Sequence, residues 1–246
     1  MLPVNLTIDI GNTRSKLGLF DNDYLIQPFS FPNSDLAKEL SNIGVNYPAI
    51  KRIIVASVIK LNSEYLIDFM KLYESIILDH TTPLPIVNSY TSLTTLGHDR
   101  IAAAVGANKL FPNSNVLVID AGTSITYEFI NVKNCYLGGA ISPGIAMRYK
   151  SLHTFTDQLP LYGFQDEFNL IGNSTQECII SGVQIGVLAE VNGIIEQYKK
   201  RYTSLQVILT GGNVTFFEKH LKNSIFVAPH LVLEGLNEIL KFNEKN

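Results

Sequence analysis

The sequence contains no tryptophan, only two cysteines and no excess of basic residues. Cys135 and Cys178 lie far apart and do not form a CxxC pair, so we expect two buried thiols rather than a disulfide framework or a cysteine zinc site. Lysine and arginine number 19 against 22 aspartate and glutamate residues, a net charge of −3, and no basic run could follow a phosphate backbone. The composition therefore gives no support for nucleic-acid binding.

Targeting and membrane signals are also missing. The N-terminal residues MLPVNLTIDI lack a basic region followed by a long apolar region, and no later apolar stretch approaches the roughly 18 residues of a membrane span. We therefore expect a cytoplasmic protein without a membrane partner. Hydrophobic residues make up 46% of the chain and charged residues 17%, which predicts a packed core rather than disorder.

Periodicity in the first half of the chain predicts alternating strands and helices. A strand over 6–10, a turn at 11–13 and a strand over 16–20 together indicate a β-hairpin. The next elements expected are a helix over 34–43 that ends at Gly44, a strand over 52–58, a helix over 63–77 and an alanine-rich helix over 101–110. The four residues Gly97 to Arg100 open that last helix.

The pattern restarts near residue 115. There VLVIDAGTSITYEFI repeats the layout of NLTIDIGNTRSKLGLF, an apolar strand that ends in aspartate, a glycine-containing turn and a second strand. A glycine-rich stretch over 138–144, a long helix over 175–202, a strand over 205–210 and a final helix over 233–242 follow. The repeat predicts two similar α/β lobes, residues 1–113 and 114–246.

Both aspartate-glycine turns are candidates for phosphate binding. Such turns expose backbone N–H groups and small side-chain donors toward anionic oxygens. Asp9 and Asp120, at the two strand ends, could supply oxygen ligands to the cation that accompanies ATP, and Lys16 could offset phosphate charge. For either hairpin alone an ordinary turn is favoured, because Asp-x-Gly and Gly-Asn are common turn sequences. The repetition favours phosphate binding. No GxGxxG follows the first strand, so a dinucleotide-binding dehydrogenase is not indicated.

The ordered set of motifs resembles the type III pantothenate kinases, within the superfamily of actin, hexokinase and the heat-shock ATPases. The resemblance spans essentially the whole chain and implies an actin-like ATPase fold, in which two ribonuclease H-like lobes enclose a nucleotide cleft. One small departure is Ser124, where the family often has alanine after DAGT. The matching motifs are DxGNTxxK at 9–16, GxDR at 97–100, DAGT at 120–123, GGxIxPG at 138–144, Gly172 to Thr175, and TGG at 210–212.

The resemblance implies an ATP-dependent kinase that phosphorylates pantothenate. Asp99 would be the general base that accepts the proton of the substrate hydroxyl, and Arg100 would pair with the pantothenate carboxylate. Without the surrounding motifs, Asp99 could equally be a helix N-cap and Arg100 a surface ion-pair residue.

The remaining site assignments also follow from the resemblance. Asp120 would hold a monovalent cation, K⁺ or NH₄⁺, although the sequence does not separate K⁺ from Mg²⁺ there. Tyr90 and Thr175 fall at substrate-contacting positions, but each could instead belong to the core or to a helix cap. His153 is left unassigned. ATP with Mg²⁺ would contact Asp9, Ile10, Gly11, Asn12, Thr13, Arg14, Ser15, Lys16 and Thr123, and pantothenate would contact Tyr90, Gly97, His98, Asp99, Arg100 and Thr175.

Family resemblance also implies a homodimer. Gly182, Gly186 and Gly193 on the long helix could allow close helix approach between subunits, or equally within the second lobe. Two other functions stay open, a phosphohydrolase of the same superfamily and a regulatory binding protein without turnover. The adjacent Asp99 and Arg100 favour a bound acidic substrate over water, and retention of Asp9, Lys16 and Asp99 favours an active enzyme.

Overall fold

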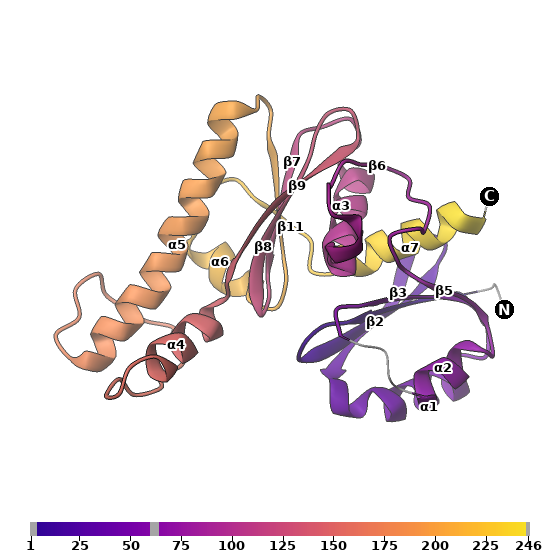
Figure 1. The fold of residues 1–246 in the computed structure, drawn as a ribbon, viewed down its shortest axis with the longest axis horizontal. Coiled ribbons are helices and arrows are strands. Elements are labelled where there is room, and N and C mark those ends of the chain that lie inside the picture. Colours follow the sequence, from indigo (N-terminus) through magenta and orange to yellow (C-terminus); the bar gives the residue numbers. More distant parts are fainter. Residues whose placement is uncertain (1–3, 60–63, 245–246) are drawn as a thin grey trace. The chain divides into compact units, whose positions relative to one another are not determined.

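The computed structural model describes residues 4–59 and 64–244, which form two compact units (Figure 1). The first unit comprises residues 1–114, 130–138 and 230–246, and the second comprises 115–129 and 139–229. The predicted boundary after residue 113 lies one residue from the first of these divisions. The predicted contiguous lobes differ from the units because the strand region 130–138 and the C-terminal helix belong to the first unit.

The first unit is built on a five-stranded sheet of order β3-β2-β1-β4-β5. β1 and β2 are antiparallel, as are β2 and β3, whereas β4 runs parallel to β1 and β5 parallel to β4. This order confirms the predicted N-terminal hairpin. The strands are β1 Val4–Ile10, β2 Arg14–Asp21, β3 Tyr24–Pro32, β4 Ile50–Ser57 and β5 Glu74–Ile77.

Helices cover both faces of this sheet. α1 Leu36–Asn46 and α2 Glu64–Met70 pack on one face, where Ile8 of β1 is buried in one core with Leu40 and Phe69 of the two helices. α7 Leu231–Glu244 contacts β1, β2 and β4 on the other face, and α3 His98–Leu110 packs against α7 (Figure 1). Because β4 is covered on both sides, its residues 53–56 are a continuous, fully buried apolar run.

Glycines allow α3 and α7 to approach closely. A Cβ at Gly106 would lie 2.5 Å from the carbonyl oxygen of Leu231, and a Cβ at Gly235 would lie 1.8 Å from that of Ala102. No side chain larger than hydrogen fits at either position with the backbones where they are. The alanine-rich sequence of α3 therefore reflects a helix buried against another helix.

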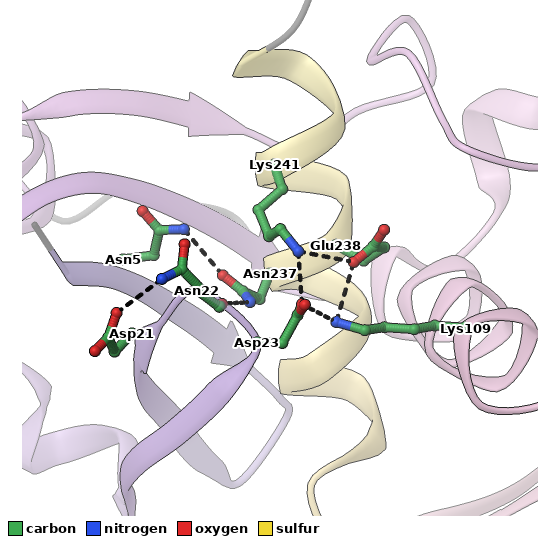
Figure 2. Close-up of polar contacts among 8 residues, drawn as sticks. All are labelled: Asn5, Asp21, Asn22, Asp23, Lys109, Asn237, Glu238 and Lys241. Atoms are coloured by element: carbon green, nitrogen blue, oxygen red, sulfur yellow. Dashed lines mark hydrogen bonds and ion pairs between the residues drawn. The ribbon is translucent and has the colours of Figure 1, made fainter.

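An ion-pair cluster, consisting of Asp23, Lys109, Glu238 and Lys241, joins the β2–β3 turn to α3 and α7 (Figure 2). Lys241 Nζ lies 2.6 Å from Asp23 Oδ1, and Lys109 Nζ lies 3.1 Å from Glu238 Oε2. The two lysines lower the pKa of Asp23 to about 2. Beside the cluster, Asn237 accepts a hydrogen bond from Asn5 and donates one to the carbonyl of Asn22.

The second unit repeats the strand arrangement of the first. The six-stranded sheet has the order β11-β10-β7-β8-β9-β6, in which β10 is parallel to both β7 and β11. Its last strand, β6, belongs to the first unit. β6 pairs with Cys135 and Tyr136, the part of β9 that belongs to the first unit. The strands are β6 Val87–Asn88, β7 Val116–Ala121, β8 Ser124–Ile130, β9 Cys135–Pro143, β10 Gln206–Thr210 and β11 Phe226–Val227.

Three helices complete the second unit: α4 Ile145–Thr154, α5 Thr175–Arg201 and α6 Val214–His220. The long helix predicted over 175–202 is confirmed. Contrary to the expectation from the sequence, α5 is long and apolar enough to cross a membrane, but 44% of its most apolar window is buried. Its buried residues, including Val187, Val191 and Ile195, join the core formed with β7, β8 and β10. One face of α5 therefore contributes to the core of the second unit.

Three other sequence-based predictions are wrong. The helix predicted over 63–77, whose first residue lies outside the described residues, ends at Met70, and residues 74–77 form β5 instead. Gly44 does not end α1, which continues to Asn46; a Cβ there would lie 3.2 Å from the Phe69 ring, so glycine permits helix approach. The two thiols are not buried, since Cys135 is half-buried and Cys178 exposed.

Candidate active site

The first phosphate-binding candidate is the turn between β1 and β2. The N–H of Gly11 donates to the carbonyl of Arg14 at 3.1 Å, and Asn12 and Thr13 lie exposed at the tip. Asp9 faces Lys16 in the antiparallel register and is 7% exposed. The turn therefore presents polar groups at its tip and a nearly buried carboxylate at its base.

Asn33, which sequence reasoning missed, braces this turn. Its side-chain amide donates to the carbonyl of Gly11 at 2.9 Å, and its side-chain oxygen accepts from the Ser15 hydroxyl at 2.9 Å. Its backbone N–H also donates to the carbonyl of Thr13 at 3.3 Å. The only sequence signal for this residue would have been its place at the end of β3, a strand that was not predicted.

Two residues predicted to contact the nucleotide have partners within the first unit. The Arg14 guanidinium donates to the hydroxyl and carbonyl oxygens of Ser30 on β3, at 3.2 and 2.8 Å. Ser15 is fully buried and donates to Asn33. In this structure both side chains hold the hairpin in place, which leaves the turn backbone and Asn12 and Thr13 facing outward.

The second candidate region is the N-terminus of α3. Gly97 is the N-cap residue, and Asp99 Oδ1 accepts a 2.8 Å hydrogen bond from the N–H of Arg100. A carboxylate in the first helical turn is favoured by the helix dipole. A Cβ at Gly97 would lie 2.6 Å from Asp99 Oδ1, so glycine provides the space that the Asp99 carboxylate occupies.

His98 connects this helix start to the end of the central strands. Its Nδ1 lies 3.1 Å from the carbonyl oxygen of Ser57, so in this contact Nδ1 carries the proton and donates. Ser57 is the register partner of Ile10, and the N–H of Val58 donates to the Ile10 carbonyl at 3.1 Å. The structure thus brings the α3 N-terminus, with Asp99, to the same strand ends as the β1–β2 turn that is predicted to bind phosphate.

Arg100 and Tyr90 are also brought together. Arg100 is 7% exposed, which differs from a surface ion-pair residue, and its Cζ lies 5.6 Å from the centroid of the Tyr90 ring. That distance is typical of a cation–π contact. Tyr90, half-buried, follows β6 and stacks on Tyr136 of β9.

In the second unit, Asp120 lies where two turns meet. Thr210 of β10 is its register partner, and a Cβ at Gly211 would lie 2.4 Å from Asp120 Oδ1. Gly211 has φ +97°, a conformation that favours glycine. Asn213 fastens the turns together, because its backbone N–H and side-chain amide both donate to the carbonyl of Ala121, at 2.9 and 3.1 Å. The TGG turn therefore packs directly against the DAGT turn.

The other side of the DAGT turn contacts the end of β9. The N–H of Gly144 donates to the Thr123 carbonyl at 3.2 Å, and a Cβ at Gly144 would lie 2.3 Å from the same oxygen. Thr123 itself is exposed. The glycine of the Pro143-Gly144 pair thus lets the chain run against the predicted phosphate-binding turn.

Arg148 of α4 holds that segment in place. Its guanidinium donates to the Pro143 carbonyl and the Ser142 hydroxyl, both at 2.9 Å, and to Glu190 of α5 at 2.5 Å. The hydroxyl of the buried Tyr127 donates to Glu190 at 3.1 Å. Burial alone would raise the pKa of Glu190, but its hydrogen bonds and the Arg148 charge outweigh burial and lower this pKa. Burial raises the pKa of Tyr127. Glu190 is therefore an ionised anchor for Arg148.

Thr175 stands on a separate element, at the first turn of α5. Ser174 is the N-cap and accepts a hydrogen bond from the N–H of Glu177, while the Glu177 carboxylate accepts from the N–H of Asn173. This arrangement resembles a capping box, except that the Glu177 carboxylate accepts from the residue before the N-cap. Thr175 is exposed and is not the cap itself.

Metal ions would depend on few protein ligands. Among residues 4–59 and 64–244, no group of three or more His, Cys, Asp and Glu side chains could hold a metal. Asp9 and Asp120 instead lie in different units, each near the end of a strand and beside a glycine-containing turn. Such a donor set fits a cation that takes its remaining oxygen ligands from phosphate and water.

Two α/β units, each with a hairpin next to parallel strands, place this protein in the actin-like ATPase fold class. Three solved structures share this fold: a Baf family transcriptional activator from Campylobacter jejuni (TM-score 0.64, 22% identity, 98% and 100% of the two chains covered), a polyphosphate/ATP-glucomannokinase from Arthrobacter (0.54, 13%, 98% and 99%) and a ROK family glucokinase from Streptomyces griseus solved with glucose and AMPPNP (0.53, 10%, 99% and 100%). At these identities they show the fold alone.

The family follows from closer relatives. The family model described as type III pantothenate kinase matches residues 5–197. Proteins of that name from Phocaeicola vulgatus and Christiangramia forsetii are 45% and 43% identical, with 98% of this chain covered in both cases and 100% and 99% of the relatives. This chain belongs to the type III pantothenate kinase family.

Proposed function

We propose that this protein transfers the γ-phosphoryl group of ATP to pantothenate and releases 4′-phosphopantothenate and ADP, the first step of coenzyme A biosynthesis. The observation that carries this conclusion is the family match over residues 5–197, which includes both aspartate-glycine turns and the GxDR segment. As in kinases generally, ATP is used with a divalent metal ion. The metal supplies charge neutralisation at the phosphates.

Asp99 is proposed as the general base. The pantothenate hydroxyl oxygen attacks the γ-phosphorus, the bond to the ADP oxygen breaks, and Asp99 accepts the hydroxyl proton. Its position supports this role, because the carboxylate is half-buried at a helix N-terminus in space left by Gly97. His98 is proposed to hold this helix start through Ser57.

Arg100 is proposed to bind the pantothenate carboxylate, with Tyr90 and Thr175 as further substrate contacts. A planar guanidinium matches a carboxylate in two parallel hydrogen bonds, and near-complete burial strengthens such a charge pair. The hairpin residues Asp9 to Lys16 and the exposed Thr123 are proposed to bind the ATP phosphates. Thr175 is accessible at the first turn of α5.

Asp120 is proposed to bind a monovalent cation, K⁺ or NH₄⁺. Its carboxylate lies at the junction of the DAGT and TGG turns, where carbonyl oxygens and phosphate could complete an oxygen-rich ligand set. We further propose a cytoplasmic homodimer. Gly182, Gly186 and Gly193 support contact between subunits rather than packing within the unit, because a Cβ at any of them would meet nothing within 4 Å.

The direct test is to incubate the purified protein with ATP, Mg²⁺ and pantothenate, with and without K⁺, and to follow ADP and the phosphorylated product by mass. Pantothenate-dependent ADP with phosphopantothenate is expected, with higher rates in K⁺. ADP without the phosphorylated product would indicate a hydrolase, and no turnover in either salt would indicate a binding protein. Asp99→Asn should fold and bind pantothenate but lose about 10²–10⁴-fold in rate.

A further inference from the structure

A cation and two aromatic rings from three separate segments form a continuous contact in the first unit. The Cζ atom of Arg100 lies 5.6 Å from the Tyr90 ring centroid, and that centroid lies 6.1 Å from the centroid of Tyr136, with 24° between the ring planes. Arg100 is 7% exposed and Tyr136 fully buried. Tyr90 therefore links an arginine of α3 to a core residue of β9.

The backbone around Tyr90 is fixed to the strand that carries Tyr136. The N–H of Ser89 donates to the Tyr136 carbonyl at 3.0 Å, and Asn88 is the register partner of Tyr136 in the parallel pairing of β6 with β9. The Asn88 side chain in turn accepts a hydrogen bond from the N–H of Tyr90 at 3.1 Å. The position of the Tyr90 ring thus depends on β9.

Gly138 completes this arrangement, two residues after Tyr136. It has φ +95°, which residues with a side chain rarely adopt. A Cβ there would also lie 3.1 and 3.3 Å from two edge atoms of the Tyr90 ring. The backbone conformation therefore favours glycine at this position, and a side chain there would press on the Tyr90 ring.

We propose that Tyr136 and Gly138 are positioning residues that act on Arg100 through Tyr90 and thereby set the preference for a carboxylate-bearing substrate. This inference rests on the proposed function, in which Arg100 binds the pantothenate carboxylate. Two parallel hydrogen bonds to a carboxylate need a fixed guanidinium orientation, and long arginine side chains lose that orientation without a supporting surface. The Tyr90 ring, held against Tyr136 and fitted beside Gly138, provides that surface.

The test compares pantothenate with its neutral analogue in which a hydroxymethyl group replaces the carboxylate. Steady-state kinetics on the full chain would give kcat/KM for both substrates and the KM for ATP. Tyr136→Leu removes the ring that supports Tyr90, so Tyr90 no longer holds Arg100 in place. It should lower kcat/KM for pantothenate about tenfold, the size of a lost cation–π contact between Arg100 and Tyr90 in a buried site. The value for the neutral analogue and the KM for ATP should change less than about twofold. Tyr136→Phe, which keeps the ring, should keep the wild-type ratio of the two kcat/KM values.

The chain offers a matched control at the end of α5. There Arg201 Cζ lies 5.6 Å from the Tyr202 ring, and Tyr202 stacks on Tyr198 with 6.0 Å between centroids and 26° between planes. This contact has similar geometry and belongs to the second unit. Tyr198→Leu should therefore leave the ratio of the two kcat/KM values unchanged.

Gly138→Ala acts on the same ring by a different route and should also lower the preference for pantothenate. If Tyr136→Leu does not fold, as judged by its thermal transition, this variant decides the question. Equal losses for both substrates, or an increased KM for ATP, would show a merely structural role and overturn the proposal. A wild-type protein that phosphorylates neither substrate would instead remove the proposed function, on which this inference rests.

Discussion

Replacing Gly97 with alanine should impair catalysis far more than folding. Gly97 has φ −59° and ψ 132°, so alanine meets no backbone strain there. Its Cβ, however, would lie 2.6 Å from Asp99 Oδ1 and 3.4 Å from Cγ of Arg100. The shorter contact is too close, so the Asp99 carboxylate has to move and release the 2.8 Å hydrogen bond from the Arg100 N–H.

The two effects differ in size. A misplacement of about 1 Å costs roughly 100-fold in rate, within the range of about 10²–10⁴ for complete loss of a general base. We therefore expect kcat to fall about 100-fold. Alanine is also a poorer N-cap than glycine, by at most about 1 kcal/mol. For a chain of this size that lowers Tm by only about 2–4 °C.

The assay is pantothenate-dependent ADP release at saturating substrates, together with a thermal unfolding curve. Gly163→Ala is the control, because a Cβ at Gly163 has no neighbour within 4 Å. Since both changes act on one carboxylate, Gly97→Ala combined with Asp99→Asn should be no slower than Asp99→Asn alone. Full activity in a normally folded Gly97→Ala variant would refute the assignment of Asp99 as the base.

Three further predictions concern stability and the second unit. Gly235→Ala should lower the free energy of unfolding in urea by about 1–3 kcal/mol, because its Cβ would overlap the Ala102 carbonyl. This loss should exceed the gain that alanine brings in helix propensity. Asp23→Asn should lower the free energy of unfolding at pH 7 by less than about 1 kcal/mol, since the Asp23 side chain is 59% exposed. The pKa of Asp23, about 2, lies below the ordinary value of 3.8. The stability that its ion pairs contribute is therefore present above pH 3.8 and lost as the pH falls through 2 (Figure 2). An Asp23→Asn variant that is destabilised as much at pH 2 as at pH 7 would contradict the ion pairing. Arg148→Gln and Glu190→Gln should each raise the KM for ATP. The effects of the two changes should be coupled by about 1 kcal/mol in the double variant. Strictly additive effects would count against the two residues acting as one anchor.

The parts of the candidate site that depend on neighbouring residues in the sequence could be predicted. An apolar strand, an aspartate and a glycine turn specify a hairpin locally, and both β1–β2 and β7–β8 formed as expected. The long helix predicted over 175–202 also formed, as α5 Thr175–Arg201. The roles of individual side chains at these turns stay predictions.

Other features depend on partners far away in the chain. β3 contains Pro28 and Pro32, which argue against a strand in a sequence window, yet β3 is an edge strand and tolerates them. Residues 74–77 carry a helical spacing, but their pairing with β4 makes them a strand. Asn33 supports the hairpin from the end of β3, so its role could not be seen before β3 was known.

The place of α7 in the first unit has a consequence for biosynthesis. Residues 231–244 cover the sheet of the N-terminal hairpin and pack against the helix that begins with His98 and Asp99. A chain emerging from the ribosome therefore cannot finish packing its first unit until the second unit and α7 have been synthesised. Nascent chains that end before residue 231 leave the sheet face and the glycine contacts of α3 exposed. The N-terminal sheet, although synthesised first, is therefore covered on both faces only after the C-terminal helix has been made.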